Sequence, residues 1–411
     1  MIRIFQGEPT IKPSRDREGA VNQTVRPIID AIRTHGDAAL LGYARELDGL
    51  GDLPVRVSED ELARAASALC PQVCRAAEIA IANIRQFAKE QLPRERFTEF
   101  SPGRKLGWIV RPLESVGCYI PSGRYPLPST LLMTAVLAQT AGVPRICVAS
   151  PRPSVEILAC AHLLGIGEVY RVGGAQAIAA MAFGTETIRR VDRIVGPGNA
   201  YVSAAKKLLA GEVGIDFVAG PTEILILTAE GDPRIIAADM LAQAEHDPAA
   251  RAMLITSSDS LAKAVSAEIE RQLQTLPTAE VARQSIENGS FIAVVPDMDS
   301  AVAISNRIAP EHLSLHDPSL LSKITNAGTV FLGQNSPESA GDYTSGPSHV
   351  LPTGGLARLR GGLSVTDFVK VIAIQQLSSS ALQELAPAIT TLARAEGLEA
   401  HALSVEVRFV N

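Results

Sequence analysis

Apolar side chains recur at three- and four-residue spacing near the start of the chain, which is the period of an α-helix. Residues 22–95 are therefore predicted to be mainly helical. A break is expected around Gly36 and a stop at Gly49 and Gly51, because glycine is a poor helix former. A second helical stretch is expected from Ser58 to Gln91, where it opens on an acidic first turn.

From residue 106 onward, short runs rich in β-branched residues alternate with Ala/Leu-rich segments of helical period. A first series of strands is expected at residues 116–120, 145–150, 168–172, 192–196 and 215–220. The intervening helices are expected around residues 130–142, 154–164, 175–183 and 200–209. This alternation predicts a parallel sheet with helices on both faces.

The alternation then restarts and predicts a second α/β sheet. Its strands are expected at residues 224–228, 252–256, 291–295, 312–315 and 330–333. Its helices are expected at residues 233–245, 258–274 and 298–307. From Val365 the chain is predicted to be largely helical, and its terminal run SVEVRFV (residues 404–410) is predicted to be a strand.

Composition narrows the class of protein. Of the 411 residues, 46% are hydrophobic and 20% are charged, which excludes disorder as the dominant state. The net charge of −6 argues against a nucleic-acid binder that relies on a basic face. The charged N-terminal segment predicts no signal peptide, and no transmembrane helix is expected. Five cysteines, an odd number, suit reduced thiols in a cytoplasm.

Two Gly-rich turns follow expected strands of the first sheet, at Gly173-Gly174 and at Gly196-Pro197-Gly198-Asn199. Ligands commonly bind at the carboxyl ends of strands in such sheets, and helix N-termini attract phosphates. Neither turn has the spacing G-x-G-x-x-G, and glycine at such turns often serves geometry alone. Two interpretations stay open: a dinucleotide site without the usual fingerprint, or structural turns.

Two pairs of polar residues stand close together in the second half. In the helix IIAADMLAQAEHD, Gln243 and His246 are three apart and share one face. Such a pair can ligate a metal, although a histidine near a helix C-terminus can also simply interact with the dipole. In NRIAPEHLSL, Glu311 and His312 are adjacent. Successive strand residues point to opposite faces, so both reach one site only where the backbone is irregular; the alternative is a solvated pair.

Two further segments carry candidate ligands. SPESAGDYTSGPSHVLPTGG places Asp342 and His349 in a Gly-rich loop, which is either a ligand-binding loop or a flexible surface loop. EGLEAHALSVEVRF places Glu396 and His401 at a helix end. An N2O2 donor set that suits zinc, or another borderline divalent metal, comprises Gln243, His246, Asp342 and His401. Spacing alone does not establish that these four converge.

Taken together, the motifs resemble the histidinol dehydrogenase family over nearly the whole chain. The carrying segments are VGCYIPSGRYPLPSTLLM, VGGAQAIAAMAFGT, VDRIVGPGNAYV, IDFVAGPTE, ADMLAQAEHDP, NRIAPEHL, SAGDYTSGPSHVLPT, GGLSVTDFVK and EGLEAHALSVEVR. The resemblance implies an NAD- and zinc-dependent oxidation of L-histidinol through L-histidinal to L-histidine. It also implies a cytoplasmic homodimer with shared active sites, and no nucleic-acid or membrane partner.

The family fold implies two doubly wound α/β domains that are incompletely Rossmann-like, one inserted in the other. The expected division is an N-terminal arm at 1–14, a first α/β domain at 15–115 and 227–363, a second, NAD-binding α/β domain at 116–226, and a small, helical C-terminal domain at 364–411. The last is expected to contribute to the active site of the partner subunit.

The resemblance also implies roles, carried over motif by motif. The zinc ligands would be Gln243, His246, Asp342 and His401. The general acid/base residues would be Glu311, as activator of water, and His312, as the base. The NAD contacts would include Tyr119, Gln176 and Asn199. The substrate contacts would include Thr222, His349 and Glu396, together with Glu311 and the four zinc ligands.

Two departures leave a second reading open. Arg124-Tyr125 stands where the histidinol enzymes often have a small residue and alanine, and Ser348 stands where asparagine is common. An Arg-Tyr pair resembles related zinc-dependent dehydrogenases of sulfonated diols. From other classes, a zinc hydrolase would leave the glycine turns without a role, and a silent zinc-binding paralogue would have no need to keep every site residue.

Overall fold

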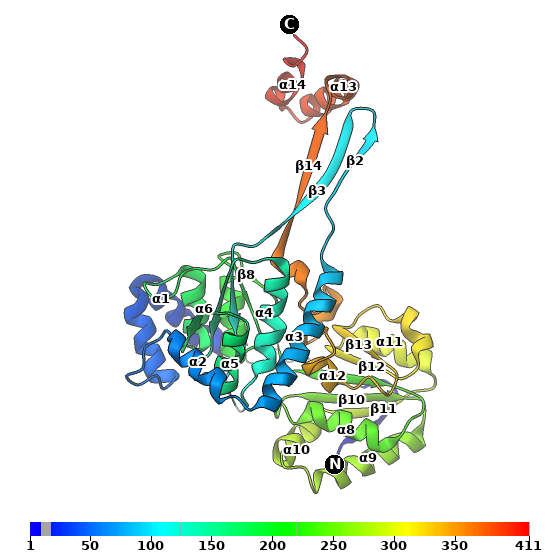
Figure 1. Cartoon of the computed structure of the whole chain (residues 1–411). Helices are drawn as coiled ribbons and strands as arrows, with labels where there is room; N and C mark the ends of the chain where they lie inside the picture. The colour runs from blue at the N-terminus through cyan, green and yellow to red at the C-terminus, as the bar shows by residue number, and fades with distance from the viewer. Residues whose placement is uncertain (10–17, 124, 219, 411) are drawn as a thin grey trace. The chain divides into compact units, whose positions relative to one another are not determined.

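The computed structural model describes residues 1–9, 18–123, 125–218 and 220–410. The chain forms two compact units (Figure 1). The first comprises Met1–Gln91 and Leu113–Phe368, and contains two parallel α/β sheets. The second comprises Leu92–Pro112 and Val369–Asn411. No helix among the described residues is long and apolar enough to cross a membrane.

The first sheet of the large unit is parallel and has the strand order β6-β5-β4-β7-β8. Its strands are β4 (Ser115–Tyr119), β5 (Arg145–Ala149), β6 (Glu168–Tyr170), β7 (Arg193–Val195) and β8 (Gly214–Ile215). The connecting helices are α4 (Pro128–Ala141), α5 (Val155–Leu163), α6 (Gly174–Phe183) and α7 (Ala200–Leu209). Strands β5 and β6 follow β4 on one side, and β7 and β8 continue on its other side, so the strand order reverses between β4 and β7 and their carboxyl ends form the topological switch point of this sheet.

Three N-terminal helices pack on the outside of the helices that connect the strands of this sheet. They are α1 (Glu18–Leu47), α2 (Glu59–Ala68) and α3 (Pro71–Gln91). Helix α1 packs on α6 and α7, α2 packs on α5, and α3 packs on α4. The break expected in the helical pattern occurs at Gly36, which has φ 51° and ψ −129° within α1. These helices therefore bury their apolar faces against the helices of the five-stranded sheet. The family resemblance had led us to expect residues 15–115 in the domain of the other sheet.

The second sheet is also parallel and has the order β1-β11-β10-β9-β12-β13. Its strands are β1 (Arg3–Gln6), β9 (Glu223–Leu227), β10 (Arg251–Thr256), β11 (Phe291–Val294), β12 (His312–Leu315) and β13 (Thr329–Leu332). Its helices are α8 (Pro233–Ala244), α9 (Asp259–Leu273), α10 (Ala279–Asn288) and α11 (Met298–Ile308). The whole five-stranded sheet is inserted between β1 and β9. Residues expected as an N-terminal arm thus supply an edge strand, and those at 10–14 lie outside the described residues.

Alternate residues of β9 fill two cores on opposite faces of this sheet. Ile224 and Ile226 pack with α8, α9 and α10, whereas Leu225 and Leu227 pack with α11. Strand β9 is fully buried on both faces, as the apolar run ILIL predicts. The rest of the unit consists of η1 (Pro318–Lys323), α12 (Glu338–Tyr343), η2 (Leu356–Arg358) and η3 (Val365–Phe368).

The second unit is an antiparallel sheet of order β14-β3-β2, followed by two helices. Its elements are β2 (Arg96–Ser101), β3 (Arg104–Pro112), β14 (Val369–Leu377), α13 (Ser379–Ala395) and α14 (Glu399–Glu406). Two expectations are wrong here. The run VKVIAIQQL is strand β14, not helix, because its β-branched residues pair along the full length of β3.

The terminal run SVEVRFV was predicted to be a strand, but its first three residues, 404–406, end helix α14, and residues 407–410 lie outside any strand. Ala402 and Val405, three residues apart, are the buried side chains of this helix, which is a helical spacing. Arg394 on α13 pairs with Glu399 and Glu406, one on each end of α14. Burial of Ala402 and Val405 on one helical face outweighs the local β propensity of the alternating valines.

Candidate active site

The expected acid/base pair lies where β12 begins. Ala309 ends α11 in a left-handed conformation, with φ 53°, and Glu311 precedes the strand. The irregular backbone lets both side chains of the pair turn toward β9: Glu311 Oε2 lies 3.6 Å from His312 Nδ1. Both residues are buried, so the alternative of a solvated pair does not hold. The carboxylate of Glu311 accepts hydrogen bonds from Thr222 Oγ1 at 2.6 Å and from the backbone N–H of Glu223 at 2.8 Å.

The imidazole of His312 is held in one tautomer. Its Nδ1 lies 3.2 Å from the backbone carbonyl of Glu223, which can only accept, so Nδ1 carries the hydrogen. Among the described residues its Nε2 has no hydrogen-bond partner, and it lies 3.8 Å from Asp342 Oδ1. Burial lowers the pKa of His312 to about 4. The ring is therefore neutral near pH 7, with a free lone pair on Nε2 that can accept a proton.

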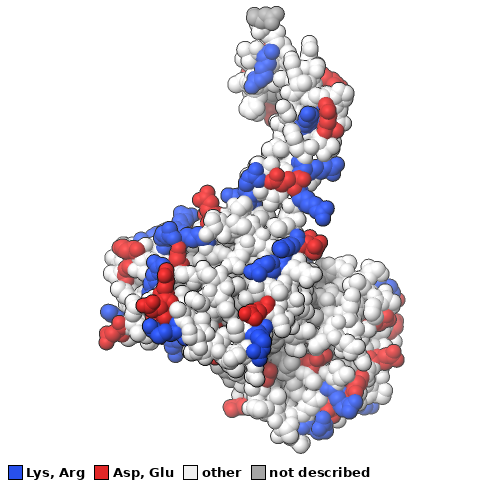
Figure 2. Space-filling model, in the orientation of Figure 1, with Lys and Arg blue, Asp and Glu red and all other residues white. Residues whose placement is uncertain are grey.

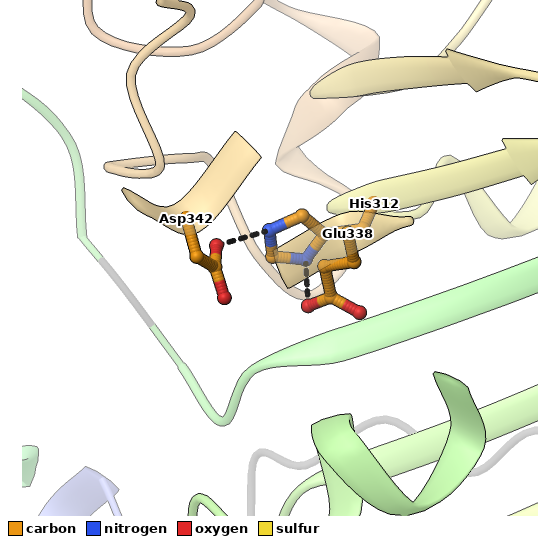
Figure 3. A group of neighbouring side chains, drawn as sticks. All are labelled: His312, Glu338 and Asp342. Carbon is orange, nitrogen blue, oxygen red and sulfur yellow. Dashed lines mark ion pairs between the residues drawn. The ribbon is translucent and has the colours of Figure 1, made fainter. Parts of the chain in front are cut away.

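Sequence reasoning missed Glu338, which lies beside His312. The segment read as a Gly-rich loop forms the short helix α12, and its one-turn spacing places Glu338 and Asp342 on one face. Glu338 Oε1 lies 3.3 Å from His312 Nδ1. Figure 3 shows the imidazole between the two carboxylates. Donor atoms of His312, Glu338 and Asp342 all lie within 4.8 Å of one another. The E-x-x-x-D spacing in SPESAGD was the available signal.

Two of the expected zinc ligands come from the end of α8. Gln243 is fully buried in its last turn, and His246 follows the helix. His246 donates from Nδ1 to the carbonyl of Ala242 at 3.0 Å, which leaves Nε2 free, 4.0 Å from Asp342 Oδ2. His246 and Asp342 are thus brought together, and Gln243 contacts Glu338, whose carboxylate lies within 4.8 Å of a donor atom of Asp342. Their oxygen and nitrogen donors are of the kind that zinc binds.

Buried carboxyl groups gather around these donors. Burial, opposed by the hydrogen bonds from Thr222 and Glu223, raises the pKa of Glu311 well above its ordinary value. Burial and the neighbouring carboxylates do the same to the pKa of Glu338. Burial raises the pKa of Asp239, one turn before Gln243, to about 6. Gathered acids of this kind, beside a histidine with a free Nε2, fit a divalent cation and a cationic substrate, because either would neutralise them.

His349 links this site to helix α4 of the five-stranded sheet. Its Nδ1 donates to the backbone carbonyl of Asp342 at 2.7 Å, and its Nε2 lies 3.1 Å from Thr130 Oγ1 on α4. Ser348, the second departure noted in the sequence, is buried, with its hydroxyl 3.4 Å from the carbonyl of Met133. The expected substrate residue His349 therefore borders Asp342 and also positions its backbone.

The three expected NAD residues lie at or after the carboxyl ends of strands in the five-stranded sheet. Tyr119 ends β4, and its buried hydroxyl accepts from the N–H of Gly174 at 3.2 Å. Gln176 in α6 is buried and donates to Asp48 Oδ2 at 3.1 Å. Asn199 caps α7 with its side-chain oxygen and is exposed. Sequence reasoning missed Asp48, which also accepts from the backbone of the glycine turn.

Glu396 and His401 belong to the second unit. Glu396 ends α13, His401 lies in α14, and both are exposed. Cys118, beside Tyr119, is buried, and burial raises the pKa of its thiol to about 12. A thiol of this kind is not a nucleophile near pH 7.

The comparison with known proteins decides the family. The sequence profile described as histidinol dehydrogenase matches residues 11–409. The chain belongs to the histidinol dehydrogenase family. Histidinol dehydrogenase of Rhizobium meliloti is 48% identical over 399 residues, covering 94% of this chain and 92% of that protein. That of Thermus thermophilus is 49% identical over 396 residues, covering 94% of each chain.

A solved histidinol dehydrogenase, from Elizabethkingia anophelis, has the same fold as this chain. It is 36% identical, covers 99% of this chain and 98% of its own, and superposes with a TM-score of 0.93. The family resemblance and the expected α/β fold class are thereby confirmed. Of the first departure from the family pattern, Arg124 lies outside the described residues. The Tyr125 hydroxyl lies 3.5 Å from the carbonyl of Glu245, next to His246.

Proposed function

We propose that the protein oxidises L-histidinol through L-histidinal to L-histidine, with NAD and zinc, as the last steps of histidine biosynthesis. The observation that carries the proposal is the neutral, buried imidazole of His312, with its free Nε2 directed toward the donor cluster, in a member of this family. An alcohol oxidation requires a base for the hydroxyl proton and an acceptor for hydride. His312 Nε2 takes the proton, and bound NAD supplies the hydride acceptor.

The second oxidation needs water at the aldehyde carbon, and Glu311 is the group we assign to activate it. Its carboxylate, 3.6 Å from the His312 ring, lies close enough to act at the same centre. Thr222 and the Glu223 N–H hold its Oε2 in place, and burial raises its pKa well above the ordinary value, which makes the carboxylate a stronger base.

Zinc is proposed to be held by Gln243, His246 and Asp342, together with His401 of the partner subunit. Zinc bound there supplies a Lewis acid that anchors the imidazole and amine nitrogens of the substrate. Glu396 of the partner subunit would complement the positive charge of histidinol. His349, beside Asp342, would contact the substrate with Thr222.

The homodimer is proposed because the second unit exposes many large apolar side chains. Those on the three-stranded sheet are Phe97, Phe100, Trp108, Val371 and Ile372. Those on the two helices, or directly flanking α14, are Leu392, Leu398, Leu403 and Val407. Figure 2 shows wide uncharged areas on this unit. Exposed apolar surface of this extent is typical of a surface that a partner covers, and a second copy is the partner that the family implies.

NAD is proposed to bind at the switch point of the five-stranded sheet, near Tyr119, Gln176 and Asn199. The N-terminal ends of α6 and α7 lie after β6 and β7, where such sheets bind nucleotides. The buried free thiols Cys118, Cys147 and Cys160 support a reducing compartment, the cytoplasm.

The test follows NADH formation with L-histidinol and with a sulfonated diol such as dihydroxypropanesulfonate, before and after removal of the metal. We expect turnover of L-histidinol alone, and we expect it to be lost with chelator and restored by zinc. Turnover of the diol alone would favour the related dehydrogenases of sulfonated diols, which the Arg124-Tyr125 pair resembles. Hydrolysis without any NAD requirement would favour a zinc hydrolase instead.

A further inference from the structure

Asp48 is a buried acid that contacts the start of a helix distant in sequence. It directly follows α1 and is 7% exposed. Its backbone N–H donates to the carbonyl of Ala44, and Gly49 then turns the chain in a left-handed conformation, with φ 67°. Helix α1 packs on α6 (Figure 1). The end of α1 therefore holds the carboxylate of Asp48 beside the glycine turn that begins α6.

One carboxylate oxygen of Asp48 accepts two buried hydrogen bonds. Its Oδ2 accepts from the backbone N–H of Gly173 at 2.9 Å and from Gln176 Nε2 at 3.1 Å. The next N–H along the chain, that of Gly174, donates to the hydroxyl of Tyr119 at 3.2 Å. Both N–H groups of the glycine turn are thus taken by side chains, so neither is free for a phosphate. The turn is fixed from two sides, by Asp48 and by Tyr119.

The same carboxylate decides which end of the Gln176 amide lies against the turn. With Nε2 on Asp48, the amide oxygen Oε1 lies so close to Gly174 that a Cβ atom on this glycine would be 2.6 Å from it. The reverse orientation would set the amide oxygen against the carboxylate, two acceptors facing each other. Among the described residues Oε1 has no hydrogen-bond partner, and Gln176 is 1% exposed. Buried acceptors are rarely left without a partner, so this one fits a ligand that supplies a donor.

We propose that Asp48 is a positioning residue for NAD binding, which acts by accepting hydrogen bonds from Gly173 and Gln176. It fixes the shape of the glycine turn without touching the nucleotide, and it leaves the amide oxygen of Gln176 as the free acceptor. What matters is hydrogen-bond acceptance at one oxygen, and not the charge of the carboxylate. This inference rests on the proposed function, because it takes Tyr119 and Gln176 as NAD contacts.

The test compares three variants of the full-length protein. Asp48→Asn keeps a carbonyl oxygen that can accept both bonds, and Asp48→Leu has a similar shape without an acceptor. The matched control is Asp37→Leu. Asp37 lies in α1, and its carboxylate accepts from the backbone N–H of Thr187 at 3.3 Å and from the hydroxyl of the same residue at 2.5 Å. Thr187 follows α6, so the control removes equivalent bonds at the opposite end of this helix.

The measurements are the Kd and KM for NAD, the KM for L-histidinol, kcat at saturating NAD, and the melting temperature. Asp48→Leu is expected to raise the Kd and KM for NAD by about 10- to 100-fold, because two buried donors lose their acceptor. Its kcat at saturating NAD and its KM for L-histidinol should stay within about twofold, because the proposed base and zinc ligands share no contact with Asp48.

The other two variants separate positioning from stability. Asp48→Asn should bind NAD within about threefold of wild type, because its carbonyl oxygen replaces the acceptor. Asp37→Leu should lower the melting temperature but leave the Kd and KM for NAD near wild type. If Asp48→Leu does not fold, Asp48→Ser takes its place with the same expected loss of NAD affinity, because its shorter side chain does not reach both donors.

Any of three results would overturn the inference. Wild-type NAD affinity in Asp48→Leu would show that the turn does not need the acceptor. Equal losses in Asp48→Asn and Asp48→Leu would show that the charge matters instead. An equal loss of NAD affinity in Asp37→Leu would assign the effect to general destabilisation. A wild-type protein that forms no NADH, or unchanged NAD affinity in Gln176→Ala, would instead defeat the proposed function or its nucleotide site.

Discussion

The Nδ1 atom of His312 lies 3.2 Å from the backbone carbonyl of Glu223, so the first residue of β12 is tied to the first residue of β9. Both strands are buried in the middle of the six-stranded sheet. The orientation of the imidazole is therefore set by the sheet, and its basic nitrogen is directed at Asp342 by the position of the backbone.

Replacing His312 with asparagine tests the base role. An amide has no basic lone pair in the range of physiological pH, so His312→Asn is expected to lower kcat by about 100- to 10,000-fold. Zinc content should be retained, because His312 is not one of the four proposed ligands. Steady-state kinetics and metal analysis of the same preparation check both parts. A variant that turns over at the wild-type rate would refute the role.

Thr222 offers a test of the environment of Glu311. Its hydroxyl donates to the buried carboxylate at 2.6 Å, and Thr222→Val removes that donor at nearly constant volume. Loss of a hydrogen bond to a buried group costs about 1–3 kcal/mol, so we expect about a 10- to 100-fold loss of kcat. Thr222→Ser keeps the hydroxyl and should stay near wild type. Rates with L-histidinol and with L-histidinal would be compared; equal activity of the valine and serine variants would contradict this account.

Asp239 predicts how the stability of the metal-free protein depends on pH. Burial raises the pKa of Asp239 from 3.8 to about 6 in the folded state. The protonated form is therefore favoured by folding, and this contribution is complete below pH 3.8 and lost as pH rises through 6. Asp239→Asn should melt a few degrees above wild type at pH 7.5, with the difference vanishing near pH 4. Melting curves of the chelated proteins check this, and a constant difference at both pH values would be inconsistent with it.

A buried ion pair anchors the glycine turn before α7. Lys206 pairs with Asp216 and donates to the carbonyl of Gly196 at 3.0 Å, and the two charged side chains are 3% and 0% exposed. Lys206→Met leaves the Asp216 carboxylate buried without its partner, which typically costs about 3–5 kcal/mol. Denaturant unfolding measures the loss. The double variant Lys206→Met with Asp216→Asn should recover part of it; a loss below about 1 kcal/mol in the single variant would contradict the prediction.

Much of the large unit follows from local pattern alone. The strands expected at residues 116–120 and 145–150 and the helix between them coincide with β4, β5 and α4 to within a few residues. Each such strand is a short apolar run, and each helix is a longer Ala/Leu-rich run. The spacing of the apolar residues therefore predicts which elements are strands, which are helices, and that they are buried. The motifs carrying Gln243, His246, Glu311 and His312 could be found in the same way, because each lies at the end of one of these elements.

The small unit shows where local pattern fails. Strand β14 takes its partner from β3, more than 250 residues earlier in the chain, and no window of sequence contains both. The run 404–410 alternates like a strand, but residues 404–406 end helix α14, where Ala402 and Val405 are buried at helical spacing, and residues 407–410 lie outside any strand. Contacts with distant parts of the chain decide both cases.

Within the site, Glu338 and Asp48 could not be identified from their neighbours in sequence. Glu338 stands among small polar residues that are typical of a loop. Only because these residues form helix α12 does Glu338 lie on the same helical face as Asp342. Asp48 lies just after a surface helix, yet it contacts Gln176, which is 128 residues away. Both are buried acids whose partners come from distant elements, and periodicity carries no information about such contacts.

The measurement that tests the central claim most directly is the amount of NADH formed when a limiting amount of L-histidinol is consumed to completion. Oxidation of an alcohol to a carboxylic acid removes four electrons, so the account predicts two NADH per L-histidinol, with L-histidine as the product. The yield should fall to zero after chelation and return with zinc. One NADH per L-histidinol with L-histidinal accumulating, or a yield of two that persists in the chelated protein, would contradict it.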